Sequence, residues 1–181
     1  MDRIPLREHP YLFDKVAQRV QKALGDNLSW LDHAFGLAER ITRTIDGKKY
    51  VLPNIWIGGN EYIDLLPDQM KGNFAFLYLD EPQRHSNGRM SAKLNCVLWW
   101  DTRKVDASVR DRERVKSQVL DAISASGGAG HIEVVEIYDN PENIYKSFSF
   151  DETAQCALMH PFAGLRVVME AYVDADCNPY A

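Results

Sequence analysis

Two stretches of this sequence place apolar side chains on both faces of an extended strand, and they restrict the possible folds more than any other feature. They are "GNFAFLYLDEP" (72–82) and "KLNCVLWWD" (93–101). Successive side chains of a strand point to opposite faces, so a strand that is apolar throughout needs cover on both sides. Both stretches are therefore predicted to be interior strands of a sheet.

Two other segments follow the helical period instead. Across residues 9–24, apolar residues recur once per turn, at Leu12, Val16, Val20 and Leu24. This spacing predicts an amphipathic helix, and Gly25 is positioned to end it.

The second helix is predicted over residues 106–126. Its buried stripe consists of Val115, Val119, Ala122 and Ile123. Ser108, or Asp106 just before it, is suited to cap the first amides, and Asp111 and Glu113 suit the positive end of the helix dipole. The glycines of "GGAG" at 127–130 are expected to terminate it.

A hairpin is predicted at about 40–52. Asp46-Gly47 separates two runs rich in strand-forming residues, and this dipeptide favours the tight turn in which both positions have positive φ. Beyond it, Gly58-Gly59 and Pro67 indicate a loop that carries Trp56 and Tyr62.

The remaining segments complete the pattern. "QRHSNGRMSAK" is expected to be a polar loop with a turn at Asn87-Gly88. Residues 165–173 alternate apolar and mostly polar side chains, which predicts a final strand with one buried and one wet face. Residues 174–181 are expected to form a flexible acidic tail.

Helix, strands, helix and strands follow one another without an interdomain linker. This order predicts one α+β domain over residues 1–181, with a mixed or antiparallel sheet, two main helices packed on one face and a protruding hairpin.

Composition narrows the class of protein. No apolar run is long enough to span a bilayer, and the beginning of the chain lacks the apolar core of a secretory signal. The three cysteines are unclustered, which does not suggest a disulfide framework. We expect a soluble protein of a reducing compartment, without membrane contact.

Charge is unevenly distributed along the chain. Residues 131–181 carry nine acidic and two basic side chains, whereas the first 130 carry nineteen basic and seventeen acidic ones. The acidic balance does not favour nucleic-acid binding. The asymmetry fits either head-to-tail association of unlike patches or simply a solvated acidic surface.

Metal-binding patterns are incomplete. Asp174, Asp176 and Asn178 have the spacing of a calcium loop, but Pro179 occupies the position that requires glycine. Cys156 and His160 stand four residues apart without a second ligand pair. No metal or cofactor is predicted.

A nucleophilic cysteine is the main enzymatic alternative. Cys96 paired with His85, His131 or His160 would suit a small hydrolase with a loop-lined site. However, Cys96 lies in a strand predicted to be buried, where a thiolate is disfavoured. No catalytic residue is therefore assigned.

Aromatic residues suggest binding surfaces. Trp99 and Trp100 are neighbours on one strand, so one can pack in the core while the other meets a second layer or a partner. Trp56 and Tyr62 can pack locally or contact a partner. A module that binds a small molecule or peptide through exposed aromatics is a further alternative.

The stretches "KYVLPNIWIGGNEYIDLLPDQMKGNFAFLYLDEP" and "IYKSFSFDETAQCALMHPFAGLRVVMEAYV" resemble a family of small prophage-encoded proteins without assigned chemistry. The resemblance extends from about Leu31 to Val173. In size and element order this family is similar to phage tail-terminator and head-tail joining proteins, which are small α+β subunits that close into rings on a tail tube. The hairpin at about 40–52 exceeds what a minimal terminator subunit needs.

The resemblance implies a non-enzymatic assembly protein of a phage or prophage particle, located in the host cytoplasm and the virion. It would form a homo-oligomeric ring, contact other phage structural proteins, and need neither cofactor nor nucleic acid. The acidic tail of one subunit is expected to meet the basic face of the second helix in the next. The candidate interface residues are Asp46, Gly47, Trp56, Tyr62, Trp100, Arg110, Arg112, Arg114 and Lys116.

Overall fold

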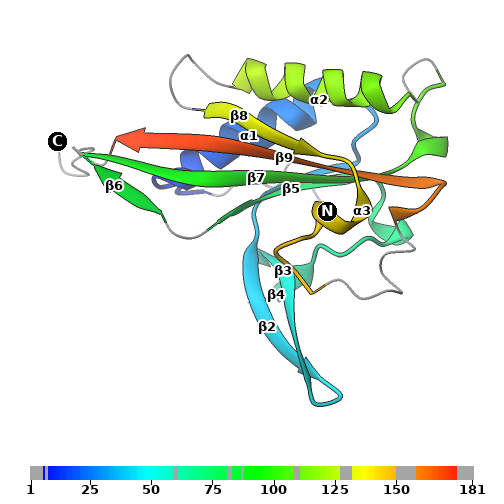
Figure 1. The fold of residues 1–181 in the computed structure, drawn as a ribbon, viewed down its shortest axis with the longest axis horizontal. Coiled ribbons are helices and arrows are strands. Elements are labelled where there is room, and N and C mark those ends of the chain that lie inside the picture. The colour runs from blue at the N-terminus through cyan, green and yellow to red at the C-terminus, as the bar shows by residue number, and fades with distance from the viewer. Residues whose placement is uncertain are drawn as a thin grey trace.

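The fold is α+β, as predicted, in a computed structural model of the 181-residue chain. The structure describes residues 6, 8–58, 61–80, 83–86, 88–107, 111–126, 132–149 and 158–174. Helices cover one side of a main sheet, and a smaller sheet extends from the other side (Figure 1).

The main sheet is mixed. Its strand order is β1 (His33–Leu37), β5 (Phe74–Leu79), β7 (Arg89–Asp101), β9 (Phe162–Asp174) and β8 (Ile132–Tyr138). The β1–β5 pair is parallel and the other pairs along this order are antiparallel. The two stretches predicted to be interior strands are β5 and most of β7, and both lie between other strands, as expected.

Two helices, α1 (Phe13–Asn27) and α2 (Arg112–Ser126), pack on one face of this sheet. The predicted apolar stripe of α1 is largely buried, with Val16, Val20 and Leu24 at most 1% exposed. The prediction that Gly25 ends the helix is wrong. Gly25 is buried within α1, which continues to Asn27, because tertiary packing outweighs the low helix propensity of glycine.

The predicted buried stripe of α2 is confirmed at Val115, Val119, Ala122 and Ile123. The helix begins later than predicted. Asp111 caps it, since its carboxylate Oδ1 accepts a hydrogen bond from the Glu113 amide at 2.9 Å. Ser108 lies outside the described residues, as does the glycine segment 127–130.

The opposite face of the sheet is covered by a second, aromatic-rich cluster. Phe74, Phe76, Tyr78 and Trp99 pack there against Tyr145 and Phe148, which follow the short helix α3 (Pro141–Ile144). The prediction of a mostly wet face for the last strand is right only for its second half. On that face of β9, Arg166 and Val168 are 5% and 3% exposed, whereas Glu170 and Tyr172 are partly accessible and Asp174 is exposed.

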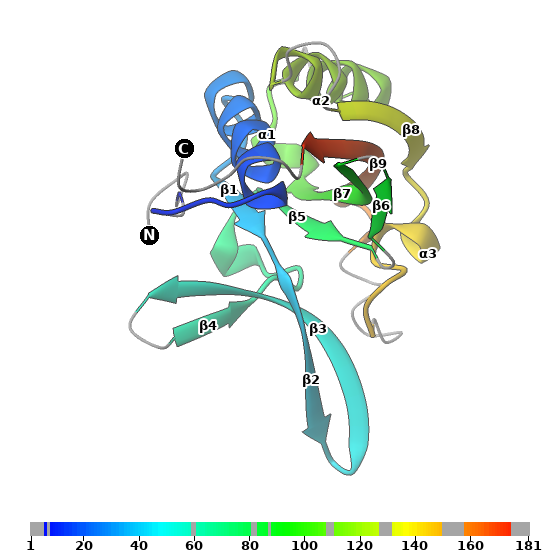
Figure 2. The same cartoon turned by 90° about the vertical axis from the view of Figure 1, so that its left-hand side faces the viewer.

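The smaller sheet contains β2 (Glu39–Ile45), β3 (Lys48–Gly58) and β4 (Glu61–Asp64) in that order. β2 and β3 form a hairpin whose turn residues, Asp46 and Gly47, have φ of 50° and 75°. This hairpin stands apart from the main sheet in both views (Figures 1 and 2). We refer to residues 42–50, its distal part, as the arm.

The predicted polar loop after β5 is partly a strand pair. β6 (Arg84–Ser86) pairs with the first residues of β7, opposite Arg89, Met90 and Ser91. Short 3-10 helices cover Gln69–Lys71 and Thr102–Lys104. Among the described residues, none of the helices has the length and hydropathy needed to cross a bilayer.

Candidate functional site

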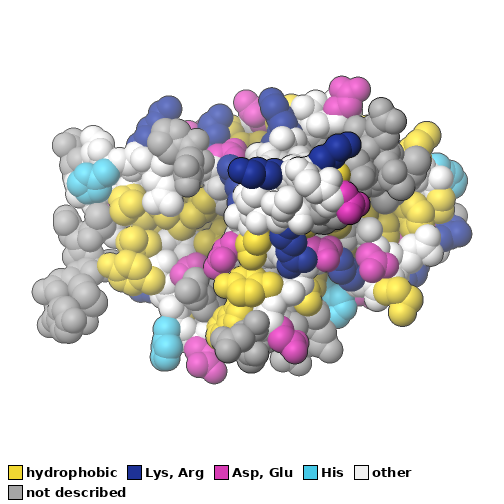
Figure 3. Space-filling view, turned by 90° about the horizontal axis from the view of Figure 1, so that it is seen from below, with side chains coloured by type: hydrophobic (Ala, Val, Ile, Leu, Met, Phe, Trp, Pro, Cys, Tyr) yellow, Lys and Arg dark blue, Asp and Glu magenta, His cyan; other side chains and the backbone are white. Residues whose placement is uncertain are grey.

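The arm is a solvent-exposed, basic β-hairpin. The side chains of Thr42, Arg43, Thr44, Asp46, Lys48 and Lys49 are exposed. Residues 42–50 hold three basic and one acidic side chain. Lys48 and Lys49 form no ion pair with any described residue. Arg43 donates to the neutral Asn54 side chain at 3.0 Å and, after Lys71, helps to lower the pKa of Asp64. Lys and Arg side chains are prominent at the centre of the surface viewed from the hairpin side (Figure 3).

The base of the arm is fixed to the body. Leu52 and Ile55 are buried, and the Arg40 guanidinium forms a 2.8 Å ion pair with Asp80. Val51 and Ser149 are joined twice, because the Val51 amide donates to the Ser149 hydroxyl at 2.9 Å and the Ser149 amide donates to the Val51 carbonyl at 2.8 Å. These contacts fix the base of the hairpin to the body, whereas the side chains of the arm add little to the hydrophobic core.

Trp56 and Tyr62 form an exposed aromatic pair next to the base of the arm. The prediction placed them in a loop, but they lie directly opposite each other on β3 and β4. They are 55% and 43% exposed. Strand pairing fixes their orientation, and large, rigid, exposed aromatics of this kind commonly anchor protein interfaces.

Trp100 does not belong to an exposed surface. It is 1% exposed and packs against Trp30 on the helix side of the sheet, with ring centres 5.9 Å apart. Trp99 is equally buried on the other side. The expectation that Trp100 contributes to an interface is wrong because both faces of β7 are covered within the chain.

The basic face of α2 is less available than the sequence suggests. Arg112 and Arg114 are exposed, but the Lys116 ammonium already pairs with Glu113 at 2.7 Å and with Asp139 at 2.8 Å. Hydrogen bonds to Asp139 and Glu113 raise the pKa of Lys116, so its charge is satisfied within the chain. Arg110 and the tail residues 175–181 lie outside the described residues.

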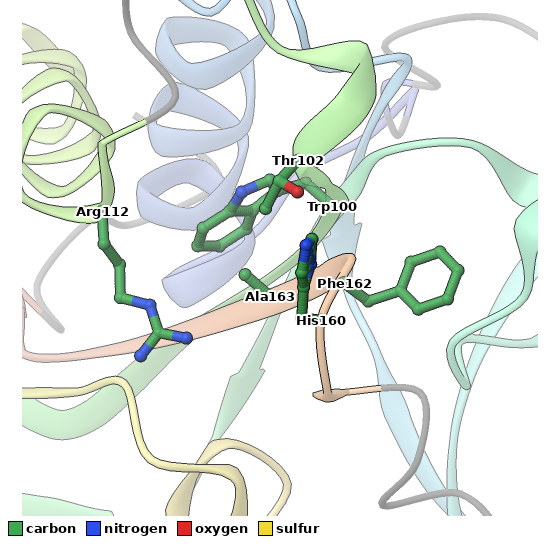
Figure 4. A pocket seen from close by; sticks show the side chains of 6 residues that line it. All are labelled: Trp100, Thr102, Arg112, His160, Phe162 and Ala163. Carbon is green, nitrogen blue, oxygen red and sulfur yellow. The ribbon is translucent and has the colours of Figure 1, made fainter. Parts of the chain in front are cut away.

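An open pocket of about 290 Å³ lies at one end of the main sheet, near the start of α2. It is lined by Trp100, Thr102, Arg112, His160, Phe162 and Ala163. Arg112 extends from the start of α2 toward β9, and His160 lies on the other side of the Trp100 and Ala163 side chains in this view (Figure 4). The lining combines two groups that can carry positive charge with an apolar floor.

The described residues of the proposed cysteine–histidine hydrolase site do not form one site. Cys96 is fully buried, and desolvation raises the pKa of its thiol to about 12, so a thiolate is not populated at neutral pH. His85 is exposed on β6 and His160 lines the pocket. His131 and Cys156 lie outside the described residues.

The metal patterns gain no support from geometry. Within the described residues, no three histidine, cysteine or acidic side chains gather in a way that could hold a metal ion. Asp174 ends β9 and pairs with Arg89 at 3.2 Å. Asp176, Asn178 and Cys177 lie outside the described residues.

Strand β8 is a surface that the sequence analysis did not identify. It forms the outer edge of the main sheet and exposes Val135 and Ile137, which are 44% and 41% accessible. A β-bulge between Val134 and Glu136 shifts the alternation of its side chains. Its signal in the sequence is the apolar-acidic run "IEVVEIY".

Comparisons with known proteins add no identification. No family model matches the chain, and no curated protein matches it.

Proposed function

We propose that the chain is a non-enzymatic structural subunit of a phage or prophage particle, of the tail-terminator or head-tail joining type. It acts by self-association into a ring and by binding other phage structural proteins. The α+β fold agrees with the architecture expected for such subunits. The proposed location is the host cytoplasm before assembly and the virion afterwards.

The observation that carries this proposal is the arm. Its strands extend beyond the core, and β2 has no partner on its outer side within the described residues. An exposed strand edge is a template for pairing with another chain, and an isolated two-stranded hairpin is only marginally stable in water. Both features are explained when the arm rests on a neighbouring subunit.

The exposed aromatic pair supports the same function. Trp56 and Tyr62 lie on the same small sheet as the arm and add apolar area where polar side chains would suffice for solubility. Interfaces between subunits are enriched in such residues. The two features together give the small sheet a contact role.

Native mass spectrometry across protein and salt concentrations tests this function. We expect a discrete closed oligomer, with its population falling as salt screens the charged contacts. Trp56→Ser/Tyr62→Ser should weaken the oligomer without lowering the thermal midpoint of the subunit. A chain that stays monomeric at every concentration would contradict the self-association on which the proposal rests.

The pocket favours a second candidate, a module that binds a small molecule. Arg112 and His160 can bind an anionic group while the partly buried Phe162 contacts an apolar part. Saturable quenching of tryptophan fluorescence by aromatic carboxylates, lost in Arg112→Ala, would support it. Absence of saturation in the wild-type chain would exclude this candidate for that ligand class.

A further inference from the structure

The outer edge of β8 has the features of a docking site for a strand. β8 is the last strand of the main sheet, and within the described residues nothing pairs with its outer side. The exposed Val135 and Ile137 add apolar area to this edge. An exposed edge with apolar side chains is a template for pairing with another strand, although the β-bulge at Val135 interrupts its regular part.

The edge strand itself carries net negative charge. Residues 132–142 hold four acidic side chains and no basic one. Asp139 is paired with Lys116, whereas Glu133 stands opposite another acid, Glu170, whose other cross-strand neighbour is Lys93. The Glu136 carboxylate accepts a hydrogen bond from the neutral Tyr138 hydroxyl, at 2.7 Å, and this bond does not balance its negative charge. A basic occupant would therefore suit the edge.

The arm has the complementary properties. β2 spans seven residues, as does β8, and is likewise an edge strand of its sheet. β2 carries Arg43 and threonines, and threonine favours strand pairing. Lys48 and Lys49 lie on the adjoining strand β3 and form no ion pair with a described carboxylate. The arm is thus a basic hairpin with a free β2 edge, and β8 is an acidic edge.

We propose that the β2 edge of the arm in one copy of this chain pairs with the β8 edge of the next copy, with Arg43 of β2 near Glu133 or Glu136 and with Lys48 and Lys49 one strand further away, on β3. The partner is a second copy because the chain itself carries both complementary edges. This inference rests on the proposed function and specifies the contact that builds its ring.

Such a contact is head-to-tail, since the two surfaces differ. Each copy would offer one arm and one β8 edge, so every copy can bind two neighbours. Repetition of a contact of this kind closes into a ring when the rotation between copies permits it. The proposed pairing therefore explains a ring without a second type of interface.

Charge reversal tests the pairing. The arm variant is Arg43→Glu/Lys48→Glu, which reverses two charges on one face of the hairpin, the edge variant is Glu133→Lys/Glu136→Lys, and the control is Lys15→Glu/Arg19→Glu on the exposed side of α1. Native mass spectrometry should show that self-association weakens roughly tenfold or more in the arm and edge variants, and less in the control. Circular dichroism should show that all variants remain folded.

Mixing the arm variant with the edge variant is the decisive experiment. In an equimolar mixture, each reversed arm meets a reversed edge and each unchanged arm meets an unchanged edge. We expect mixed oligomers that contain both variants, at concentrations where neither assembles alone.

The possible failures are distinguishable. If the wild-type chain assembles but the arm and edge variants assemble equally well, or lose assembly without recovering it when mixed, the β2–β8 pairing is wrong and self-association stands. If the wild-type chain does not assemble, both the proposed function and the pairing are overturned.

Discussion

At the scale of single residues, Arg166 is the least expected feature of the structure. It is 5% exposed and, among the described residues, pairs with no carboxylate. Its Nη1 donates to the Tyr78 hydroxyl at 3.3 Å, its Cζ lies 4.5 Å from the Tyr138 ring centre, and its Nε has no acceptor. Burial of this charge costs free energy that these contacts offset only in part.

Arg166→Met is therefore expected to leave the free energy of unfolding unchanged or to raise it. Methionine fills much of the same volume without a charge to desolvate. Arg166→Ala should instead lower the free energy of unfolding, because it leaves a cavity. Urea denaturation of the three proteins measures this, and a large loss of stability in Arg166→Met would show that the buried charge is needed.

The buried Cys96 thiol should make the free energy of unfolding depend on pH at alkaline values. Burial raises the pKa of its thiol from 9.0 to about 12, so the unfolded chain loses this proton at lower pH than the folded chain. Its contribution to stability is complete below pH 9 and is lost as the pH rises toward 12, by about 1.4 kcal/mol per pH unit.

The comparison with Cys96→Ala isolates this effect. The difference in unfolding free energy between wild type and variant should be constant below pH 9 and shrink above it. Tyr145, whose pKa is also raised by burial, is present in both proteins and cancels. A difference that does not change with pH would indicate that the thiol is not buried.

At the scale of elements, the start of α2 depends on one cap. Asp111→Ala removes the acceptor for the Glu113 amide and should lower the free energy of unfolding by about 1 kcal/mol. Asp111→Asn should retain most of the stability because its amide oxygen can accept the same bond. Chemical denaturation measures both, and equal stability of Asp111→Ala and wild type would contradict the cap.

The sequence predicted those elements whose patterns report burial directly. The strands over 72–82 and 93–101 are interior because apolar side chains on both faces require two covers. The α2 stripe was predictable for the same reason. The wet face predicted for β9 fails only in its first half, where Arg166 is buried by contacts with Tyr78 and Tyr138 on other elements of the fold.

The candidate site was less accessible to prediction. The Asp46-Gly47 turn indicated the hairpin, since its backbone requirement is local. The exposure of Trp56 and the burial of Trp100 depend on which sheet faces are covered, which is a tertiary property. The β8 edge was missed because nothing local in "IEVVEIY" shows that its strand is the last of the sheet.

At the scale of the whole molecule, the fold combines a closed core with an extended hairpin. The main sheet is covered by helices on one face and by aromatic packing on the other. The arm lies outside this core and is anchored only at its base. The subunit should therefore fold without the arm but fail to assemble without it.

Sedimentation velocity of the wild-type chain and an arm-shortened variant tests this claim most directly. Deletion of residues 44, 45, 48 and 49 leaves Asp46-Gly47 between Arg43 and Tyr50, which are already cross-strand partners, so the turn keeps its register. We expect the wild type to sediment as an oligomer and the shortened chain, at an unchanged thermal midpoint, to remain close to the single-chain mass of 20.7 kDa. A monomeric wild type, or a shortened chain that assembles equally well, would contradict the account.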